Sequence, residues 1–238
     1  MDKKRGFTLS EVLITLGVIG VVAAITIPML MSHYNKYLVE TRLKAVYSTI
    51  LQGIKMAQYN ETALLDSKGD DGDVNGFSYR RSKEVFEAMF LPVFSGCTLY
   101  PKNSRKFYFY SADGTTSFDS NFPFTLFVGL NNGTVLGFTR GGNYDGLSFD
   151  VILNPRKKKL LAGRDYFSFM FRNDGLDNYA YLQIFKHKYD NPVGREKILE
   201  YCKSNNRFPA DATSPSYFCG HAIVQNNFKI PANYPIKF

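Results

Sequence analysis

The sequence has little from which a metal or catalytic centre could be built. Its three histidines are isolated from one another, and no H-E-x-x-H or Cys-x-x-Cys pair accompanies them, so a zinc site is not expected. The chain also lacks a G-x-S-x-G nucleophile motif, a G-x-x-x-x-G-K-[S/T] phosphate loop and a dinucleotide-binding glycine pattern. These absences argue against the common hydrolase, nucleotide-binding and dehydrogenase classes, and no pattern indicates a catalytic group.

Charged side chains are missing from a long segment near the N-terminus. Between Glu11 and Lys36 there is no Asp, Glu, Lys or Arg, and Val, Ile, Leu and Ala predominate. At about 1.5 Å per residue, such a segment can cross a hydrocarbon core of roughly 30 Å as one helix. The basic residues 3–5 precede it and favour an N-terminus on the cytoplasmic side. Pro28 lies within the segment and should kink the helix.

The order of leader, junction and apolar segment differs from that of a secretory signal peptide. In a secretory signal, the apolar stretch precedes a small-residue cleavage site and is discarded with it. Here the only small-residue junction, Gly6-Phe7, precedes the apolar segment. Cleavage at this junction would remove the basic leader and retain the membrane anchor.

Glu11 stands at the edge of the apolar segment, where an ionisable side chain is costly and its charge needs a partner. If the chain is cut after Gly6, Phe7 gains a free amine, which can act as the counter-charge within the chain or from a neighbouring copy. The alternative is that Glu11 extends its side chain towards the lipid headgroups.

The run from Gly6 to Leu13, GFTLSEVL, resembles the prepilin peptidase recognition motif of type IV pilins and type II secretion pseudopilins. The resemblance extends through Glu11 and the apolar span, and Pro28 stands where many such subunits carry a proline. It implies cleavage after Gly6, N-methylation of Phe7, and pairing of Glu11 with the N-terminal amine of an adjacent subunit during filament assembly.

The resemblance implies a non-enzymatic structural subunit of a type IV pilus-like or type II secretion filament, with no cofactor. Its expected partners are other subunits, the prepilin peptidase, an assembly ATPase and an inner-membrane assembly platform. The precursor is expected in the inner membrane as a single-pass protein with its N-terminus inside, and the mature domain in a periplasmic or cell-surface filament. Two alternatives stay open: a minor pilin of a DNA-uptake (competence) pilus, and a membrane-tethered protein of unrelated function.

With 238 residues, the chain has room for one sizeable domain beyond the anchor. The helix is expected to continue to about residue 60 because one apolar stripe recurs at helical spacing. The stripe comprises Leu43, Val46, Tyr47, Ile50, Leu51, Ile54 and Ala57. We therefore expect a leader at residues 1–6, a transmembrane or filament-core helix at 7–31, its amphipathic continuation at 32–61 and an extracytoplasmic domain at 62–238.

The rest of the chain alternates apolar and polar residues, as strands of an antiparallel sheet do. Asn132-Gly133 lies between two such segments, residues 125–130 and 134–139, and predicts a hairpin. Further strands are predicted at residues 106–110, 147–153, 167–171 and 179–188, and in the tail after Cys219.

Short helices are predicted at two places in this domain. One covers about residues 82–90, with Ser82 as its N-cap, and the other covers residues 193–203 after Asn191-Pro192. The predicted fold class is therefore α+β, with a long N-terminal helix, transmembrane in its first half, packed on an antiparallel sheet in a pilin-like arrangement.

An export anchor would place the domain outside the cytoplasm, where disulfides persist. Of the three cysteines, Cys202 and Cys219 are expected to pair and close a loop rich in Asn, Pro and Ser. Such a crosslink is worth about 3 kcal/mol in the chain-entropy model. Cys97 would then remain as a buried thiol or an intermolecular contact, and its pairing with one of the other two cysteines stays open.

One acidic and one basic cluster can each be interpreted either as solvated surface or as a binding site. Asp71, Asp73 and Asn75 match the opening of a calcium-binding loop, but Ser82 stands where the bidentate glutamate should be, so a solvated acidic turn is the alternative. The run Arg156-Lys157-Lys158-Lys159, with Arg164 nearby, is either a solvated turn or a site for DNA phosphates or an acidic partner subunit.

Overall fold

The computed structural model describes residues 8–59, 79–118, 125–140, 146–173, 182–184, 195–203 and 215–238. Contacts divide the chain into two compact units, one reaching from the N-terminus to Leu38 and the other comprising Val39–Lys237. One helix, α1 (Leu9–Tyr59), contributes residues to both units. The predicted helix from residue 7 to about residue 60 is therefore confirmed to within two residues at each end.

The second half of α1 buries one side within the domain. Its buried side chains recur every three or four residues, as a helix requires when only one of its sides is covered. They are Val39, Leu43, Val46, Tyr47, Ile50, Ile54 and Ala57. The predicted stripe is thus confirmed except at Leu51, which is half-buried.

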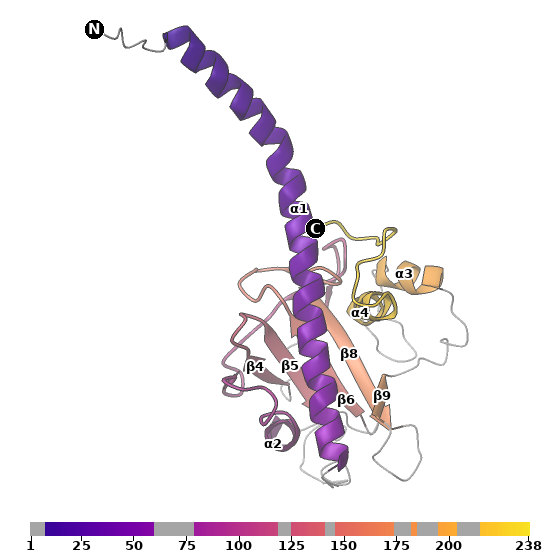
Figure 1. The fold of residues 1–238 in the computed structure, drawn as a ribbon. Coiled ribbons are helices and arrows are strands. Elements are labelled where there is room, and N and C mark those ends of the chain that lie inside the picture. Colours follow the sequence, from indigo (N-terminus) through magenta and orange to yellow (C-terminus); the bar gives the residue numbers. More distant parts are fainter. Residues whose placement is uncertain are drawn as a thin grey trace. The chain divides into compact units, whose positions relative to one another are not determined.

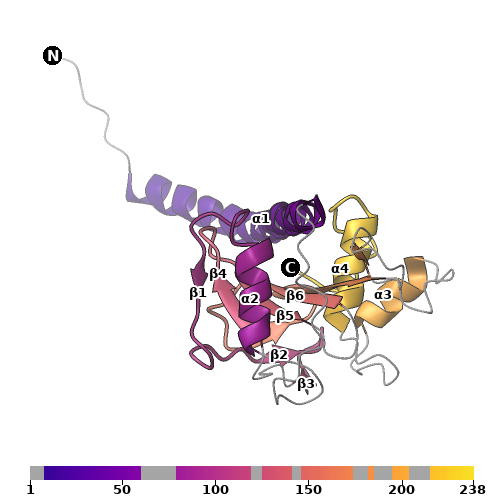
Figure 2. The ribbon, with the colours of Figure 1, turned by 90° about the horizontal axis from the view of Figure 1, so that it is seen from below.

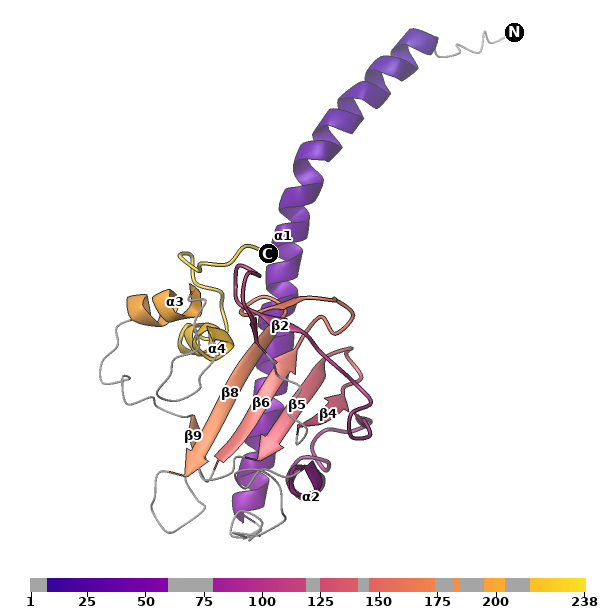
Figure 3. The ribbon, with the colours of Figure 1, turned by 180° about the vertical axis from the view of Figure 1, so that it is seen from behind.

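This stripe faces a six-stranded sheet of order β1-β4-β5-β6-β8-β9, in which every neighbouring pair is antiparallel. The strands are β1 (Thr98–Leu99), β4 (Leu126–Gly129), β5 (Val135–Arg140), β6 (Gly146–Ile152), β8 (Tyr166–Asn173) and β9 (Leu182–Ile184). Figures 1 and 3, seen from opposite sides, show the second half of α1 crossing one face of the sheet.

The predicted hairpin joins β4 and β5. Gly133 has a φ of 80°, in the left-handed region, and its N–H donates to Leu130 O at 3.0 Å. The Leu130 N–H in turn donates to Thr134 O at 2.8 Å, which closes the turn. The turn sets the register in which Leu126 pairs with Phe138.

Phenylalanines fill the layer between α1 and the sheet. Phe149 of β6 packs edge-on against Phe90 and Phe171, with ring centroids 5.2 and 5.8 Å apart. Tyr47 of α1 packs against Phe169 and Phe171 of β8 at 5.2 and 6.0 Å. Period-two alternation places these rings on one side of their strands, so the sheet and the helix share a single apolar layer.

The helix α2 (Tyr79–Met89) closes one end of this layer. Phe86 packs on Phe138 with ring centroids 5.5 Å apart, as the predicted apolar face requires. The predicted N-cap, however, is wrong, because α2 begins at Tyr79 and Ser82 lies inside it. Ser82 is fully buried and its hydroxyl accepts a hydrogen bond from the backbone N–H of Arg140 at 3.2 Å. It ties α2 to β5 and does not start the helix.

A second, smaller sheet lies on the opposite side of the main sheet from α1 (Figure 2). Its order is β3 (Ser117–Phe118), β2 (Phe109–Tyr110), β7 (Leu160–Leu161), with β2 and β7 parallel. The predicted strand at residues 106–110 is thus limited to its last two residues. A second apolar cluster joins the two sheets, and it comprises Phe107, Phe109, Phe127, Val135, Ile152, Leu160, Ala162 and Tyr166.

The C-terminal region folds as two helices, α3 (Arg195–Lys203) and α4 (Pro215–Gln225). The first confirms the predicted helix, but the strand predicted after Cys219 is wrong, because residues 219–225 belong to α4. Figures 1 and 3 show α4 beside β8, along the part of its edge that β9 does not pair. A short apolar run can form either a buried strand or a buried helix. Helix α4 is buried from Pro215 to Gly220, and its packing against the rest of the domain favours the helix.

A chain of hydroxyls connects α4 to the main sheet. Ser168 of β8 donates to the carboxylate of Asp150 on β6 at 2.5 Å, and its oxygen lies 2.7 Å from the hydroxyl of the fully buried Ser216. Burial raises the pKa of Asp150 to about 6, although the Ser168 hydrogen bond acts in the opposite direction.

This raised pKa gives the stability a pH dependence of known sign. The folded protein holds the Asp150 proton more tightly than the unfolded chain, whose Asp pKa is about 4, so stability should fall as pH rises from about 4 to about 6. Two pKa units correspond to about 3 kcal/mol, which partial solvent access reduces to ~1–2 kcal/mol. In urea unfolding, Asp150→Asn should gain that amount relative to wild type at pH 7.5 and only about a third of it at pH 4.5. An equal difference at both pH values would contradict this assignment.

Candidate functional site

The first half of α1 exposes apolar side chains on every side. Consecutive residues such as Leu13 and Ile14 are 61% and 64% exposed, and the pattern continues to Met31. Among the described residues, α1 is the one helix that is long and apolar enough to cross a membrane by length and composition. A helix that is apolar all round needs lipid or other apolar partners around it.

Two threonines within this half of α1 find hydrogen-bond partners inside the helix. Thr15 donates to Val12 O and Thr26 donates to Val22 O, both at 2.9 Å. Hydroxyls that bond to the preceding turn carry little cost in a lipid environment, because they present no unsatisfied donor. Pro28 lies inside α1, as expected, and the kink predicted there stays a prediction.

Thr8 and Glu11 form a capping box at the start of α1. The Glu11 carboxylate accepts hydrogen bonds from the backbone N–H and the hydroxyl of Thr8, both at 2.8 Å. The Glu11 N–H donates back to the Thr8 hydroxyl at 3.3 Å. A Thr three residues before a Glu is the sequence signature of this cap. The partners expected for Glu11 from the sequence were an amine and the lipid headgroups, and Thr8 was not among them.

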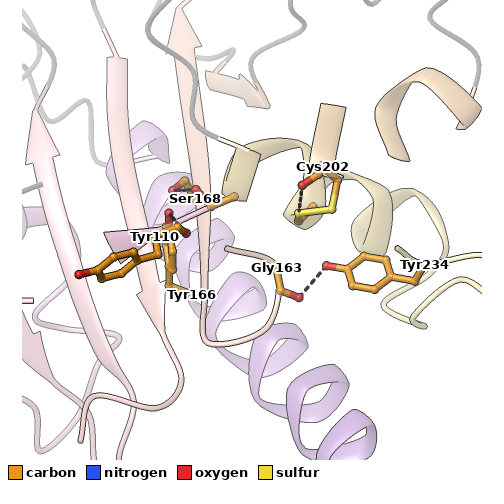
Figure 4. The surroundings of a disulfide bond; sticks show 8 residues. Tyr110, Gly163, Tyr166, Ser168, Cys202 and Tyr234 are labelled. Atoms are coloured by element: carbon orange, nitrogen blue, oxygen red, sulfur yellow. Dashed lines mark hydrogen bonds between the residues drawn. A yellow bond between two sulfur atoms is a disulfide. The ribbon is translucent and has the colours of Figure 1, made fainter. Parts of the chain in front are cut away.

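The disulfide links α3 to α4 beside the C-terminal tail. Cys202 and Cys219 are bonded and fully buried, which confirms the expected pair, and Cys97 is a free, half-buried thiol. Figure 4 shows Tyr234 of the tail reaching Gly163, whose carbonyl accepts the tyrosine hydroxyl at 2.7 Å. The tail is thereby held against the turn that precedes β8.

The tail is also bound to α1 through Glu40. The Glu40 carboxylate accepts hydrogen bonds from the Lys229 ammonium at 2.8 Å and from the backbone N–H of Ile230 at 2.9 Å. Tyr47 adds a ring contact with Phe228, with centroids 5.2 Å apart. The C-terminal tail therefore joins the second half of α1 to the rest of the domain.

The basic cluster is partly used inside the fold. The fully buried Asp165 carboxylate accepts hydrogen bonds from Lys157 at 2.7 Å, Asn154 at 3.0 Å, the Leu161 N–H at 3.1 Å and Arg164 at 3.2 Å. Two cations of the predicted cluster thus serve to fix the loop between β6 and β8. Of the predicted cluster, only Arg156, Lys158 and Lys159 fit the interpretation as a solvated turn.

These donors determine the ionisation of Asp165. Burial alone would raise the pKa of its carboxyl, but the hydrogen bonds from Lys157 and Leu161 and the charges of Arg164 and Lys157 together hold the pKa below its usual value. The charged carboxylate therefore stabilises the loop above pH ~4, and this contribution is lost as the pH falls through the lower folded-state pKa.

The remaining candidate residues include Gly6, Phe7 and the calcium-loop residues Asp71, Asp73 and Asn75, all of which lie outside the described residues. Within the described ranges, no group of three or more His, Cys, Asp or Glu side chains is placed to hold a metal ion.

Comparison with known families decides where the chain belongs. The model of a family of unknown function, DUF6613, matches residues 29–238. The chain belongs to this family. The model of the prokaryotic N-terminal methylation motif matches residues 1–27 of the same DUF6613 chain. Comparisons with curated proteins and with solved structures gave no match.

The methylation motif gives this DUF6613 member the prepilin-type cleavage and methylation signal of type IV pilins and pseudopilins. Together with the long apolar helix and the antiparallel sheet, it makes the chain a type IV pilin-like subunit with the α+β layout of that class. The two family matches meet inside α1, next to Pro28. The signal and the exposed apolar helix fit a membrane-anchored precursor.

Proposed function

We propose that the chain is cut after Gly6 and that the mature protein, starting at N-methylated Phe7, is a structural subunit of a type IV pilus-like or type II secretion filament. One observation carries the proposal: a prepilin-type signal is followed directly by a helix whose apolar side chains are exposed on every side. Cleavage ahead of that helix retains it. Lipid then covers the helix before assembly, and neighbouring subunits cover it in the filament.

The expected life cycle follows from the charges around the helix. The basic residues 3–5 keep the N-terminus in the cytoplasm, so the precursor spans the inner membrane once and its domain lies outside. The prepilin peptidase removes the leader, and an assembly ATPase and platform protein supply the work of extraction. The subunit itself contributes binding surfaces and no catalysis.

Glu11 has two partners in this scheme. In the free subunit its carboxylate is held by Thr8 in the capping box. After cleavage the amine of Phe7 is the counter-charge nearest in sequence, and in a filament the amine of an adjacent subunit can take that place. We propose that assembly exchanges hydrogen bonds within one chain for an ion pair between chains, which is stronger in a water-poor environment.

Substitutions at Glu11 can distinguish its role as an assembly charge from its role in the capping box. Glu11→Gln keeps an acceptor for the capping box but removes the charge, whereas Glu11→Ala removes both. Both variants should be processed to Phe7, and both should fall at least tenfold in the sheared filament fraction relative to wild type. The fraction is measured by immunoblot, and processing by N-terminal mass analysis of the membrane fraction.

Ser10→Ala is the matched control, because Ser10 is an exposed polar neighbour on the same turn. It should assemble within about twofold of wild type. Normal assembly of Glu11→Gln together with failure of Glu11→Ala would show that Glu11 acts as a helix cap and not as an assembly charge.

The size and the loops of the domain comprising Val39–Lys237 support a pseudopilin or a minor subunit over a major pilin. A minor pilin of a DNA-uptake pilus is the alternative, and it would need in addition a surface that binds phosphates.

A further inference from the structure

Two basic segments that are distant in the sequence are joined by the smaller sheet. Parallel pairing of β2 and β7 brings the Leu160 N–H to Tyr108 O at 2.9 Å and the Ala162 N–H to Tyr110 O at 3.0 Å. It thereby connects residues 101–113 with residues 154–165. These two segments hold eight Lys and Arg against two Asp, a net charge of +6 in a chain of net charge +8.

The side chains of these segments divide between the two sides of the small sheet. Phe109 and Leu160 point into the apolar cluster and are at most 2% exposed. The outward-facing Tyr108 is 57% exposed. Apart from Lys157, which binds Asp165, the exposed cations of the two segments are Lys102, Arg105, Lys106, Arg156, Lys158 and Lys159. We give the name basic-aromatic face to Tyr108 and Tyr110 on the outer side of the smaller sheet, together with the exposed cations that adjoin them in the two paired segments, Lys106, Arg156, Lys158 and Lys159.

The two acids of these segments cancel little of this charge at the surface. Asp165 is 0% exposed and is held from within by Lys157 and Arg164. Asp113 is exposed, and its carboxylate is bound within its own turn by Ser111 at 2.6 Å and Thr115 at 2.8 Å. Six exposed cations therefore stand against one exposed carboxylate.

Two cations of these segments lie over tyrosine rings. The Lys159 ammonium lies 4.9 Å from the centroid of the Tyr110 ring, and the Arg105 guanidinium lies 4.6 Å from that of Tyr100. Figure 4 shows the Tyr110 ring directed away from the disulfide and from Tyr166. Cations held over aromatic rings beside an exposed ring provide phosphate contacts and a stacking platform in one place.

We propose that the basic-aromatic face binds the phosphate backbone of a nucleic acid. The cations of the two paired segments can contact several phosphates, and the exposed Tyr108 ring favours a nucleic acid over an acidic protein, which offers no bases to stack. A filament subunit does not require this binding, and it would supply the phosphate-binding surface that the DNA-uptake alternative needs. The proposed assembly charge, Glu11, is not part of the face, so either proposal can fail without the other.

The test uses the full mature chain in detergent and a fluorescent 30-base DNA single strand, with anisotropy followed from 50 to 200 mM salt. If about four phosphates are neutralised, affinity should fall on the order of a hundredfold over this range. The triple variant Arg156→Gln, Lys158→Gln, Lys159→Gln should bind at least tenfold more weakly and with a shallower salt dependence. Tyr108→Ala should weaken binding about fivefold or more through lost stacking.

A second triple variant, Lys44→Gln, Lys55→Gln, Lys197→Gln, removes the same charge from exposed cations elsewhere and should bind within about threefold of wild type. Lys157 and Arg164 are left intact because they hold Asp165. Equal loss in both triple variants would overturn the proposal in favour of unspecific attraction. So would salt-insensitive or absent binding, or equally tight binding of polyglutamate, which would indicate an acidic protein partner instead.

Discussion

Gly163→Ala is expected to destabilise the domain by about 3–4 kcal/mol. Gly163 has a φ of 74°, where a side chain costs about 1–2 kcal/mol of backbone strain. A Cβ atom there would also come within 3.0 Å of Ile236, the sulfur of Cys219 and the hydroxyl of Tyr234. Overpacking of such a site costs a further 1–3 kcal/mol, because buried neighbours cannot all move.

The measurement is thermal unfolding of the full chain in detergent, followed by circular dichroism. At about 2–4 °C per kcal/mol for a domain of this size, the midpoint should fall by roughly 10 °C. Gly133→Ala is the matched control, because Gly133 has a φ of 80° but nothing within 4 Å of a Cβ atom. It should lose only the strain, about 1 kcal/mol. Equal losses in the two variants would show that the tail is not packed on Gly163.

Loss of the disulfide should have an effect of similar size. The bond closes a loop with a sequence separation of 17 residues, for which the chain-entropy model gives about 3 kcal/mol. It also anchors α4, whose Ser216 contacts β8 and whose Cys219 lies beside Gly163. Substitution of both Cys202 and Cys219 by Ser should therefore lower the unfolding midpoint by roughly 6–12 °C.

Cys97→Ser is the control for this variant, since Cys97 is a free thiol and burial raises its pKa above the usual value. It should unfold within about 2 °C of wild type, and added reductant should lower the midpoint of wild type but not that of the double variant. A loss in Cys97→Ser as large as that in the double variant would contradict the assigned pairing.

The parts of the fold that could be predicted are those whose signal is local. The stripe on α1 repeats every three to four residues over many turns, and Gly133 supplies the left-handed backbone conformation of the hairpin turn, which few other residues adopt. The apolar run of α4 failed as a prediction because Ala222, Ile223 and Val224 fit a buried strand and a buried helix equally well. The segment forms a helix because it packs beside β8 and is linked to α3 by the disulfide.

The candidate site likewise has residues that the sequence identifies and contacts that only the fold creates. The junction Gly6-Phe7 and Glu11 could be found from the sequence, because their order relative to the apolar segment is itself the signal. Asp165 could not be paired with its donors, since the chain must first close the loop between β6 and β8 before Asn154 and Lys157 reach it. The basic-aromatic face depends on the parallel pairing of β2 and β7, which no local pattern indicates.

The central claim is that the apolar helix is kept while the basic leader is removed. Mass analysis of the N-terminus of the protein, purified from the membranes of its own cells, tests this most directly. We expect a mature chain that begins at Phe7 with one methyl group on its amine. An intact chain beginning at Met1, or cleavage after the apolar half of α1, would contradict it.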